Sequence, residues 1–231
     1  MSKVPARRAS DRASGRGQRL EDPERLRVLR ATRLLDSAPE ESFDRLTRLT
    51  AHLLSVPVAQ VALVEDDRQF FKSRIVTDRE APERQTGLDR SFCKYVVTSG
   101  EPLVVADSRE VELLRDNPVT TDGEVIAYCG YPLQLSDGPI LGTLCAVDRV
   151  PRDWADQEVD LLADLSAMVV AEIELRRALQ LARRRAQDLS DAASGLRALE
   201  GALEASSIEQ EHVRAASLGL AATIAHEVRT P

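Results

Sequence analysis

The spacing of apolar residues predicts helices in the first part of the chain. In residues 23–34 and 43–54, leucines and other apolar side chains recur every three or four positions, which is the period of a helix buried on one face. Asp22 before Pro23 is typical of a helix start, because aspartate can cap free backbone N–H groups and proline is tolerated in the first turn. The pattern therefore predicts two amphipathic helices.

Further along, apolar and polar residues alternate, which is the period of a strand. Residues 58–65 and 69–76 predict one hairpin around a charged turn, and residues 124–136 and 140–147 predict a second around Asp-Gly-Pro. Between the hairpins the pattern predicts a short helix at residues 91–99 that Gly100 ends, a short strand at 102–106 and a polar helix or turn at 108–117. Two hairpins among helices indicate an α+β fold with an antiparallel sheet.

A seven-residue repeat runs through the last third of the chain, on a helix that we expect Asp153 to cap. The repeat positions are Met168, Leu175, Ala182, Leu189, Leu196 and Leu203. Their companion positions are apolar at Leu165, Leu179, Ala186 and Ala193, and charged at Glu172 and Glu200. A narrow apolar seam needs a partner helix, so we expect a parallel coiled coil and a homodimer. A single solvent-exposed helix is the alternative.

Charge is unevenly distributed. Residues 1–20 hold six Lys or Arg and one acidic residue, whereas the whole chain has a net charge of −7. The tail has almost nothing to bury, so we expect it to be disordered, and its lack of aromatic residues favours a solvated arm over nucleic-acid binding. No apolar run reaches the roughly 18 residues of a membrane span, and no secretory signal is recognisable. We therefore expect a cytoplasmic protein without a membrane partner.

The three cysteines are Cys93, Cys129 and Cys145, which give no CxxC pair. An odd number cannot close as internal disulfides alone, so we expect reduced thiols buried in the core. A redox function requires two or three of them to converge on a pocket with at least one reactive thiolate.

Six short strings carry a family resemblance. They are Leu34-Leu35-Asp36 with Pro39, Phe43 and Asp44; residues 67–73 (DRQFFKS); 91–93 (SFC); 102–107 (PLVVAD); 128–133 (YCGYPL); and 141–145 (LGTLC). In this order they resemble the GAF domain over about residues 24–177. The resemblance implies a GAF-like antiparallel sheet with flanking helices, one face of which can enclose a small ligand, followed here by the long C-terminal coiled-coil helix.

The known ligand classes of GAF domains are not supported by the residues present. The Asn-Lys, Phe and Asp-Glu pattern of cyclic-nucleotide-binding members is not recognisable in residues 117–124, which contain no Phe. Cys93 is followed by Lys94, where a bilin-attaching domain is expected to have a His. His52, the only histidine of this region, lies on an apolar helix, where a packing or surface role is expected instead of haem binding.

A ligand pocket would lie between the sheet and residues 91–99 and 107–123. The candidate lining residues are Cys93, Tyr95, Asp107, Asn117, Tyr128 and Tyr131. The alternative is that the aromatic side chains of this region simply fill the core.

The last six residues of the sequence, 226–231, read HEVRTP. A neutral imidazole can attack the γ-phosphate of ATP, and a carboxylate beside it can orient or deprotonate the ring. The string resembles the H-box of sensor histidine kinases, which implies that His226 is the phosphoacceptor. It also implies that Glu227 and Thr230 position the water that removes phosphate from the response regulator. Because position 230 is not His, an HExxH zinc site is not formed and we expect no metal.

These patterns predict four regions: a disordered basic tail at 1–21, a GAF-like sensor domain at 22–177, a coiled-coil signalling helix at 178–212 and the start of a phosphoacceptor helix at 213–231. The chain thus resembles the N-terminal sensor part of a histidine kinase. It contains no Gly-rich nucleotide loop or Mg²⁺-binding Asn motif, so we expect it to be inactive alone and to hold no cofactor. ATP and Mg²⁺ are expected only with a kinase domain that it lacks.

The resemblance implies a phosphoprotein of a two-component system. A homodimer would pass a signal from the GAF domain through the coiled coil to His226, and then by phosphorelay to the receiver domain of a response regulator. Two other functions stay open. One is a non-catalytic GAF module for dimerisation and binding of a small-molecule ligand, and the other is a Cys-based redox enzyme, such as a free methionine sulfoxide reductase, on a GAF scaffold.

Overall fold

The computed structural model describes residues 20–78 and 83–227. Contacts divide the chain into two units, Met1–Arg177 and Ala178–Pro231. Most of the tail for which we predicted disorder, residues 1–21, lies outside the described residues. None of the helices in the described ranges carries an apolar stretch of the length that a membrane crossing needs.

Two helices precede the sheet in residues 22–54, as the spacing of apolar residues predicted. They are α2 (Pro23–Ala31) and α3 (Glu41–Leu53), and each buries an apolar face. Asp22 caps α2, because its Oδ1 accepts hydrogen bonds from the backbone N–H groups of Glu24 at 2.9 Å and Arg25 at 3.4 Å.

A six-stranded antiparallel sheet forms the centre of the unit. Its strands are β1 (Val58–Val64), β2 (Arg68–Val76), β3 (Gln85–Gly87), β4 (Leu103–Val105), β5 (Ala127–Gln134) and β6 (Ile140–Asp148). They lie in the order β3-β2-β1-β6-β5-β4, so both predicted hairpins are confirmed and β1 pairs with β6 between them. Strand β3 was not predicted, because three largely exposed residues show no period.

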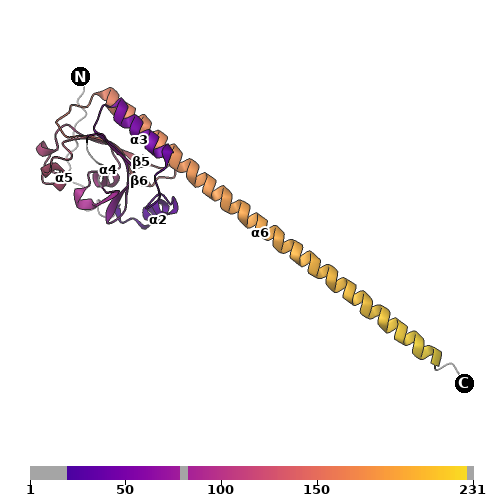
Figure 1. Cartoon of the computed structure of the whole chain (residues 1–231). Helices are drawn as coiled ribbons and strands as arrows, with labels where there is room; N and C mark the ends of the chain where they lie inside the picture. The colour runs from indigo at the N-terminus through magenta and orange to yellow at the C-terminus, as the bar shows by residue number, and fades with distance from the viewer. Residues whose placement is uncertain (1–19, 79–82, 228–231) are drawn as a thin grey trace. The chain divides into compact units, whose positions relative to one another are not determined.

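Helices cover both faces of the sheet (Figure 1). On one side, which we call the α3/α6 face, residues of α2, α3 and the first part of α6 pack with the sheet in one buried apolar cluster. On the other side, the α4/α5 face, α4 and α5 contribute to a second cluster. The central strand β1 is buried along its whole length because it contributes to both clusters.

Short elements build the α4/α5 face. They are η2 (Leu88–Arg90), α4 (Cys93–Ser99), η3 (Ser108–Glu110) and α5 (Pro118–Thr121). Helix α4 ends at Gly100, as predicted, and the φ of +73° at this residue lies in the left-handed region that glycine adopts without strain.

The last helix, α6, spans Asp156–Glu227. Four apolar residues near its start are buried in the α3/α6 face: Leu162, Leu165, Val169 and Ile173. The helix does not begin at the predicted cap, Asp153. Instead, the Glu158 carboxylate accepts a hydrogen bond from the Ala155 N–H at 2.9 Å, which satisfies a free amide at the start of the helix.

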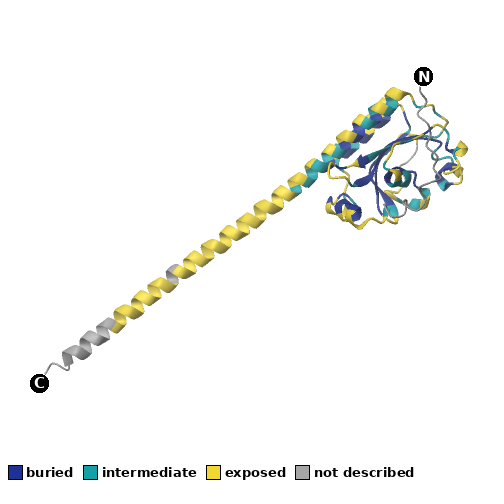
Figure 2. Ribbon diagram, turned by 180° about the vertical axis from the view of Figure 1, so that it is seen from behind, coloured by how far each residue is buried: buried dark blue, intermediate teal, exposed yellow. Residues whose placement is uncertain are grey.

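The second unit consists of the rest of α6. Every described side chain between Leu181 and Ser217 is exposed (Figure 2). The repeat positions Leu189, Leu196 and Leu203 are 72%, 62% and 69% exposed. The companion position Leu165, by contrast, is buried in the core of the first unit and is not free to join a seam with a partner helix.

Candidate functional site

The α4/α5 face contains a buried group of polar side chains. Cys93, the first residue of α4, meets Tyr128 of β5 and Cys145 of β6. The Tyr128 hydroxyl donates a hydrogen bond to Cys93 Sγ at 3.5 Å, and Cys145 Sγ lies 4.0 Å from Cys93 Sγ. Each of the three residues is at most 1% exposed. The site is therefore closed to bulk solvent.

These contacts lower the pKa of one of the three groups and raise the pKa of the other two. The Cys145 thiol lowers the pKa of Cys93 against the effect of burial, and the nearby Thr143 and Tyr128 hydroxyls add to this. Burial and the charge of the neighbouring thiols raise the pKa of Tyr128, and burial beside Cys93 raises the pKa of Cys145. Cys93 is therefore the first of the three to lose its proton.

Aromatic side chains fill the space in which a ligand pocket was expected. The rings of Phe92 and Tyr128 pack edge to face, with centroids 5.5 Å apart and planes at 67°. Both residues are buried with Val96 and Leu114 in one cluster. Phe92 and Tyr128 therefore contribute to the apolar core of this face.

Two of the polar candidates have structural partners. Asp107 begins η3, where its carboxylate accepts a hydrogen bond from the Arg109 N–H at 3.0 Å and pairs with the Arg109 guanidinium at 2.6 Å. Asn117 caps α5, since its side-chain oxygen accepts a hydrogen bond from the Val119 N–H at 3.1 Å. Both side chains hold the loop that borders the α4/α5 face.

The other two tyrosines lie apart from Tyr128. Tyr95 is half-buried on α4, and Lys94 Nζ lies 5.0 Å from the centre of its ring. Tyr131 packs against the cluster of the α3/α6 face. The structure therefore brings Cys93 and Tyr128 into direct contact and separates Tyr131 from them by the sheet.

Cys129 provides a contrast to the other two thiols. It lies in the cluster of the α3/α6 face with 0% exposure, and burial raises its pKa to about 12. All three cysteines are free and buried, as expected from their spacing.

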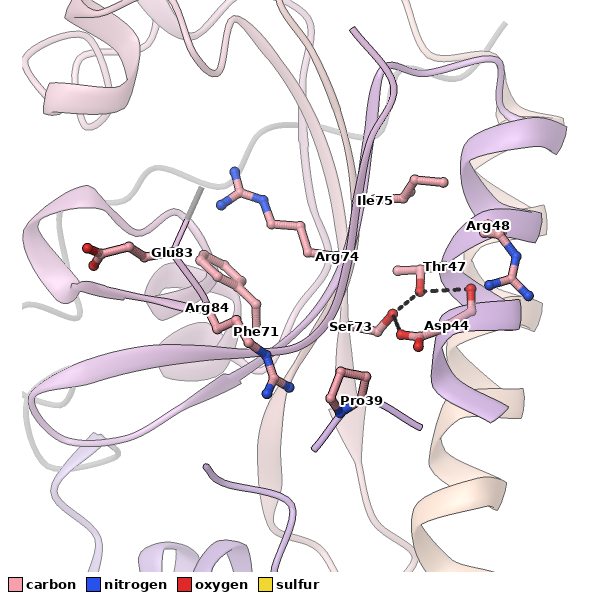
Figure 3. A pocket seen from close by; sticks show the side chains of 10 residues that line it. All are labelled: Pro39, Asp44, Thr47, Arg48, Phe71, Ser73, Arg74, Ile75, Glu83 and Arg84. Atoms are coloured by element: carbon pink, nitrogen blue, oxygen red, sulfur yellow. Dashed lines mark hydrogen bonds between the residues drawn. The ribbon is translucent and has the colours of Figure 1, made fainter. Parts of the chain in front are cut away.

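A cavity of about 330 Å³ lies between α3 and β2 (Figure 3). Asp44 and Thr47 of α3 and Ser73 of β2 line it and point towards one another. The Ser73 hydroxyl donates to the Asp44 carboxylate at 2.6 Å and shares a hydrogen bond with the Thr47 hydroxyl. Asp44 and Ser73 belong to separate strings of the sequence, and no spacing signal indicates that residues 29 positions apart meet.

Three arginines, Arg48, Arg74 and Arg84, also line this cavity. Arg48 pairs with Glu41 at 2.6 Å, and Arg84 donates to the backbone oxygen of Ser37 at 2.8 Å. The Arg74 guanidinium lies over the Phe71 ring at 4.5 Å. All three arginines already contact protein groups, so the cavity does not indicate a particular class of ligand.

A buried charge links the sheet to α6. Lys72 of β2 donates through Nζ to Ser37 Oγ and the Ala38 carbonyl, both at 2.7 Å, and to Glu40 Oε1 at 2.6 Å. Glu40 also forms an ion pair with Arg176 of α6. Burial lowers the pKa of Lys72, although Glu40 opposes this effect. A carboxylate shared by two cations thus joins β2 to the helix.

A second pair of contacts fixes the same turn of α6 to the turn between β5 and β6. Arg177 pairs with Asp137 at 2.8 Å, and the Glu174 carboxylate accepts a hydrogen bond from the Ser136 N–H at 2.7 Å. The last turn of α6 in the first unit is therefore held by charged groups from two parts of the domain.

The predicted phosphoacceptor pair, His226 and Glu227, belongs to the last turn of α6. The third predicted residue, Thr230, lies outside the described residues. The pair and the buried start of α6 are therefore parts of one helix.

Known proteins resemble the first unit. The family model of the GAF domain matches residues 38–173. The chain is 31% identical over 147 residues to a cyclic di-GMP phosphodiesterase of Pseudomonas aeruginosa, and 33% identical over 105 residues to the Nif-specific regulatory protein of Rhizobium etli. These matches cover 62% and 42% of this chain, but only 24% and 18% of those relatives. The chain thus spans about a quarter or less of their length.

Solved structures share the fold. The GAF domain of an Acinetobacter phosphoenolpyruvate-protein phosphotransferase superposes with a TM-score of 0.50 at 17% identity, over 68% of this chain and 97% of that one. The blue-light absorbing form of the Thermosynechococcus elongatus PixJ GAF-domain gives 0.51 at 17%, over 71% and 95%. With a family match over more than half of its length and this sheet and helix arrangement, the chain belongs to the GAF domain family.

Proposed function

We propose that this chain is the sensory and phosphoacceptor module of a two-component histidine kinase. The continuity of α6 carries the proposal, because the helix that begins against the GAF sheet also contains the His226-Glu227 pair of the H-box-like string. The matched relatives, a phosphodiesterase and a regulatory protein, support a regulatory setting for the GAF domain.

The ion pairs between the first unit and α6 support signal transfer along this helix. Arg176 is held by Glu40, and Arg177 is held by Asp137 on the β5–β6 turn. A change in the sheet that moves either carboxylate shifts or rotates the helix, which is a common way for a switch to pass through a packed element.

The exposed leucines of the second unit support a homodimer. Leu189, Leu196 and Leu203 recur every seven residues and are more than half exposed in a single chain. A parallel coiled coil would bury them against the same residues of a second copy. A rotation of one helix against the other would then reach His226.

The chemistry follows from the resemblance. His226 takes the γ-phosphoryl group of ATP bound by a kinase domain, with Glu227 orienting or deprotonating the imidazole. The phosphoryl group then moves to an aspartate in the receiver domain of a response regulator. Glu227 and Thr230 position the water that later removes it.

A non-catalytic GAF regulatory module is the second candidate. It is supported by the relatives, since a similar region occurs in a cyclic di-GMP phosphodiesterase and in a Nif-specific regulatory protein. In that case α6 serves dimerisation alone, and His226 is an ordinary surface residue.

Phosphotransfer in trans separates the two candidates. The chain, extended through a second dimerisation helix and given ATP, Mg²⁺ and a cognate ATP-binding domain, is expected to gain acid-labile phosphate on His226. His226→Ala should abolish the label, and Glu227→Ala should slow it roughly a hundredfold through loss of ring activation. A label that survives His226→Ala, or that falls on Ser or Asp, leaves only the regulatory module.

The same assay in a seam variant tests the coiled coil. Leu189→Asp with Leu196→Asp places charge in the seam, so light scattering should report monomers and phosphorylation should fall. The control is Ser190→Asp with Arg197→Asp, which changes exposed positions beside the seam. An unchanged dimer in the seam variant would mean that other helices hold the copies together.

A further inference from the structure

Two thiols from distant parts of the sequence meet in the α4/α5 face. Cys93 begins α4, and Cys145 lies on β6, 52 residues later. Their Sγ atoms are 4.0 Å apart. A disulfide joins sulfur atoms about 2.05 Å apart, so the pair has to close by only about 2 Å to form a bond.

The two thiols have more polar neighbours than residues in an apolar core require. Gln60 lies opposite Cys145 in the pairing of β1 with β6, and Thr143 lies two residues before Cys145. Gln60 Oε1 and Thr143 Oγ1 are buried and have no hydrogen-bond partner of good geometry among the described residues. Their influence falls on the two thiols, because Thr143 helps to lower the pKa of Cys93 and Gln60 opposes the rise in the pKa of Cys145. Buried polar atoms in native proteins are nearly always bonded. A sulfenic acid on a neighbouring sulfur atom would offer these atoms a stronger hydrogen-bonding partner than a thiol does.

We propose that Cys93 and Cys145 form a dithiol pair that hydrogen peroxide oxidises to an intramolecular disulfide. The Cys93 thiolate attacks one peroxide oxygen, the O–O bond breaks, and the leaving hydroxide takes up a proton to become water, which leaves a sulfenic acid on Cys93. The Cys145 sulfur then attacks the Cys93 sulfur, the S–S bond forms, and the S–O bond breaks with release of a second water. Two thiols are oxidised while one peroxide is reduced to two waters, and a dithiol reductant reverses the change by exchange.

The surrounding groups fit these steps. Cys93 ionises before Cys145 and is therefore the attacking sulfur. The Tyr128 hydroxyl, 3.5 Å from Cys93 Sγ, and the buried Thr143 hydroxyl can donate to a sulfenate oxygen. Both sulfur atoms are buried, so peroxide reaches them during local opening of α4, and oxidation is slower than that of an exposed thiol.

The effect of this disulfide on signalling rests on the function proposed above for α6. Bond formation draws α4 towards β6. Leu144 and Ala146, on either side of Cys145, face the other side of the sheet and lie in one cluster with Leu162 and Leu165 of α6. A displacement of β6 is therefore passed directly to the buried start of the helix.

Mass spectrometry of the full chain tests the proposal. The native chain is treated with peroxide and is then unfolded in urea and alkylated, because all three thiols are buried in the folded protein. We expect one alkylated cysteine and a mass lower by about 2 Da through the loss of two hydrogens. Trypsin releases Cys93 in residues 91–94, and both Cys129 and Cys145 in residues 116–149. The Cys129→Ala variant is therefore the matched control, because a cross-link that persists in it joins Cys93 to Cys145.

Cys145→Ser should form no cross-link and should accumulate a sulfenic acid on Cys93 that dimedone traps. Circular dichroism checks its fold, and if it does not fold, the Cys129→Ala variant decides alone. The proposal would be overturned if Cys93 and Cys145 of the natively treated chain were both still alkylated after unfolding in urea, at a peroxide dose that oxidises the urea-unfolded chain. A cross-link to Cys129 would overturn it as well. Because the readout is the mass of the chain itself, its failure leaves His226 phosphorylation untouched, and the reverse holds too.

Discussion

Cys129 and Cys145 lie on neighbouring strands, are both fully buried and face opposite sides of one sheet. On the α3/α6 face, burial raises the pKa of Cys129 to about 12 and leaves it an inert apolar side chain. On the α4/α5 face, Cys145 lies beside Cys93, Tyr128 and Gln60. Burial is the same at the two positions, so the neighbours decide what each thiol can do.

The difference suggests a division of roles between the faces. The α3/α6 face is mainly apolar, carries the start of α6 and suits transmission, because close-packed cores pass displacements on. The α4/α5 face holds groups that can change state. Its buried polar atoms, Gln60 Oε1 and Thr143 Oγ1, cost stability in the reduced state.

The largest effect should come from filling the space beside Tyr128. A Cβ at Gly130 would lie 2.3 Å from the Tyr128 hydroxyl oxygen, so Gly130→Ala has to displace the ring from Cys93. We expect a loss of about 3 kcal/mol in the free energy of unfolding, measured by urea denaturation. Gly195→Ala is the control, because nothing lies within 4 Å of its Cβ and alanine favours an exposed helix. Equal stability of the two variants would contradict the packing of Tyr128.

A matched pair of serine substitutions tests the contrast between the faces directly. Cys129→Ser buries a hydroxyl among apolar groups and should cost about 2 kcal/mol in the free energy of unfolding. Cys145→Ser places its hydroxyl beside the unbonded Gln60 Oε1, so the cost should stay below about 1 kcal/mol. Urea denaturation of the reduced proteins measures both values. The reverse order would mean that the α4/α5 face is no more polar than the other.

Local signals in the sequence predicted the fold well. Asp22, Gly100 and the two hairpins depend on short spacings, and each was confirmed. Strand β3 was missed because its pairing with β2 depends on the sheet and not on a local period.

The candidate site was harder to predict. The contact between Cys93 and Cys145 depends on how α4 seats on β6, which no spacing encodes. The separation of Tyr131 from Tyr128 was predictable, since an odd number of positions along one strand places two side chains on opposite faces. The roles of Thr143 and Gln60 could not be foreseen, because strand pairing decides what they face.

The smallest effect concerns the charged border of the α3/α6 face, where Glu40 joins Lys72 to Arg176. Burial raises the pKa of Glu40, but the hydrogen bonds and charges of Lys72 and Arg176 outweigh it and hold the pKa below its ordinary value. A carboxylate with a lowered pKa in the folded state stabilises fully above its unfolded pKa, and this contribution is lost as pH falls through the folded pKa. Glu40→Gln should therefore cost about 1 kcal/mol near neutral pH, and the difference from the unsubstituted chain should shrink between about pH 5 and pH 3.

Urea denaturation at a series of pH values measures this difference. Glu41→Gln is the control, because its ion pair with Arg48 joins side chains that are 62% and 50% exposed and should contribute almost nothing. If Glu40→Gln lowers the free energy of unfolding by the same amount at low pH, side-chain packing and not charge stabilises the contact of Glu40 with Lys72 and Arg176. The α3/α6 face would then be joined to α6 by apolar contacts alone, and the contrast between the two faces would be sharper still.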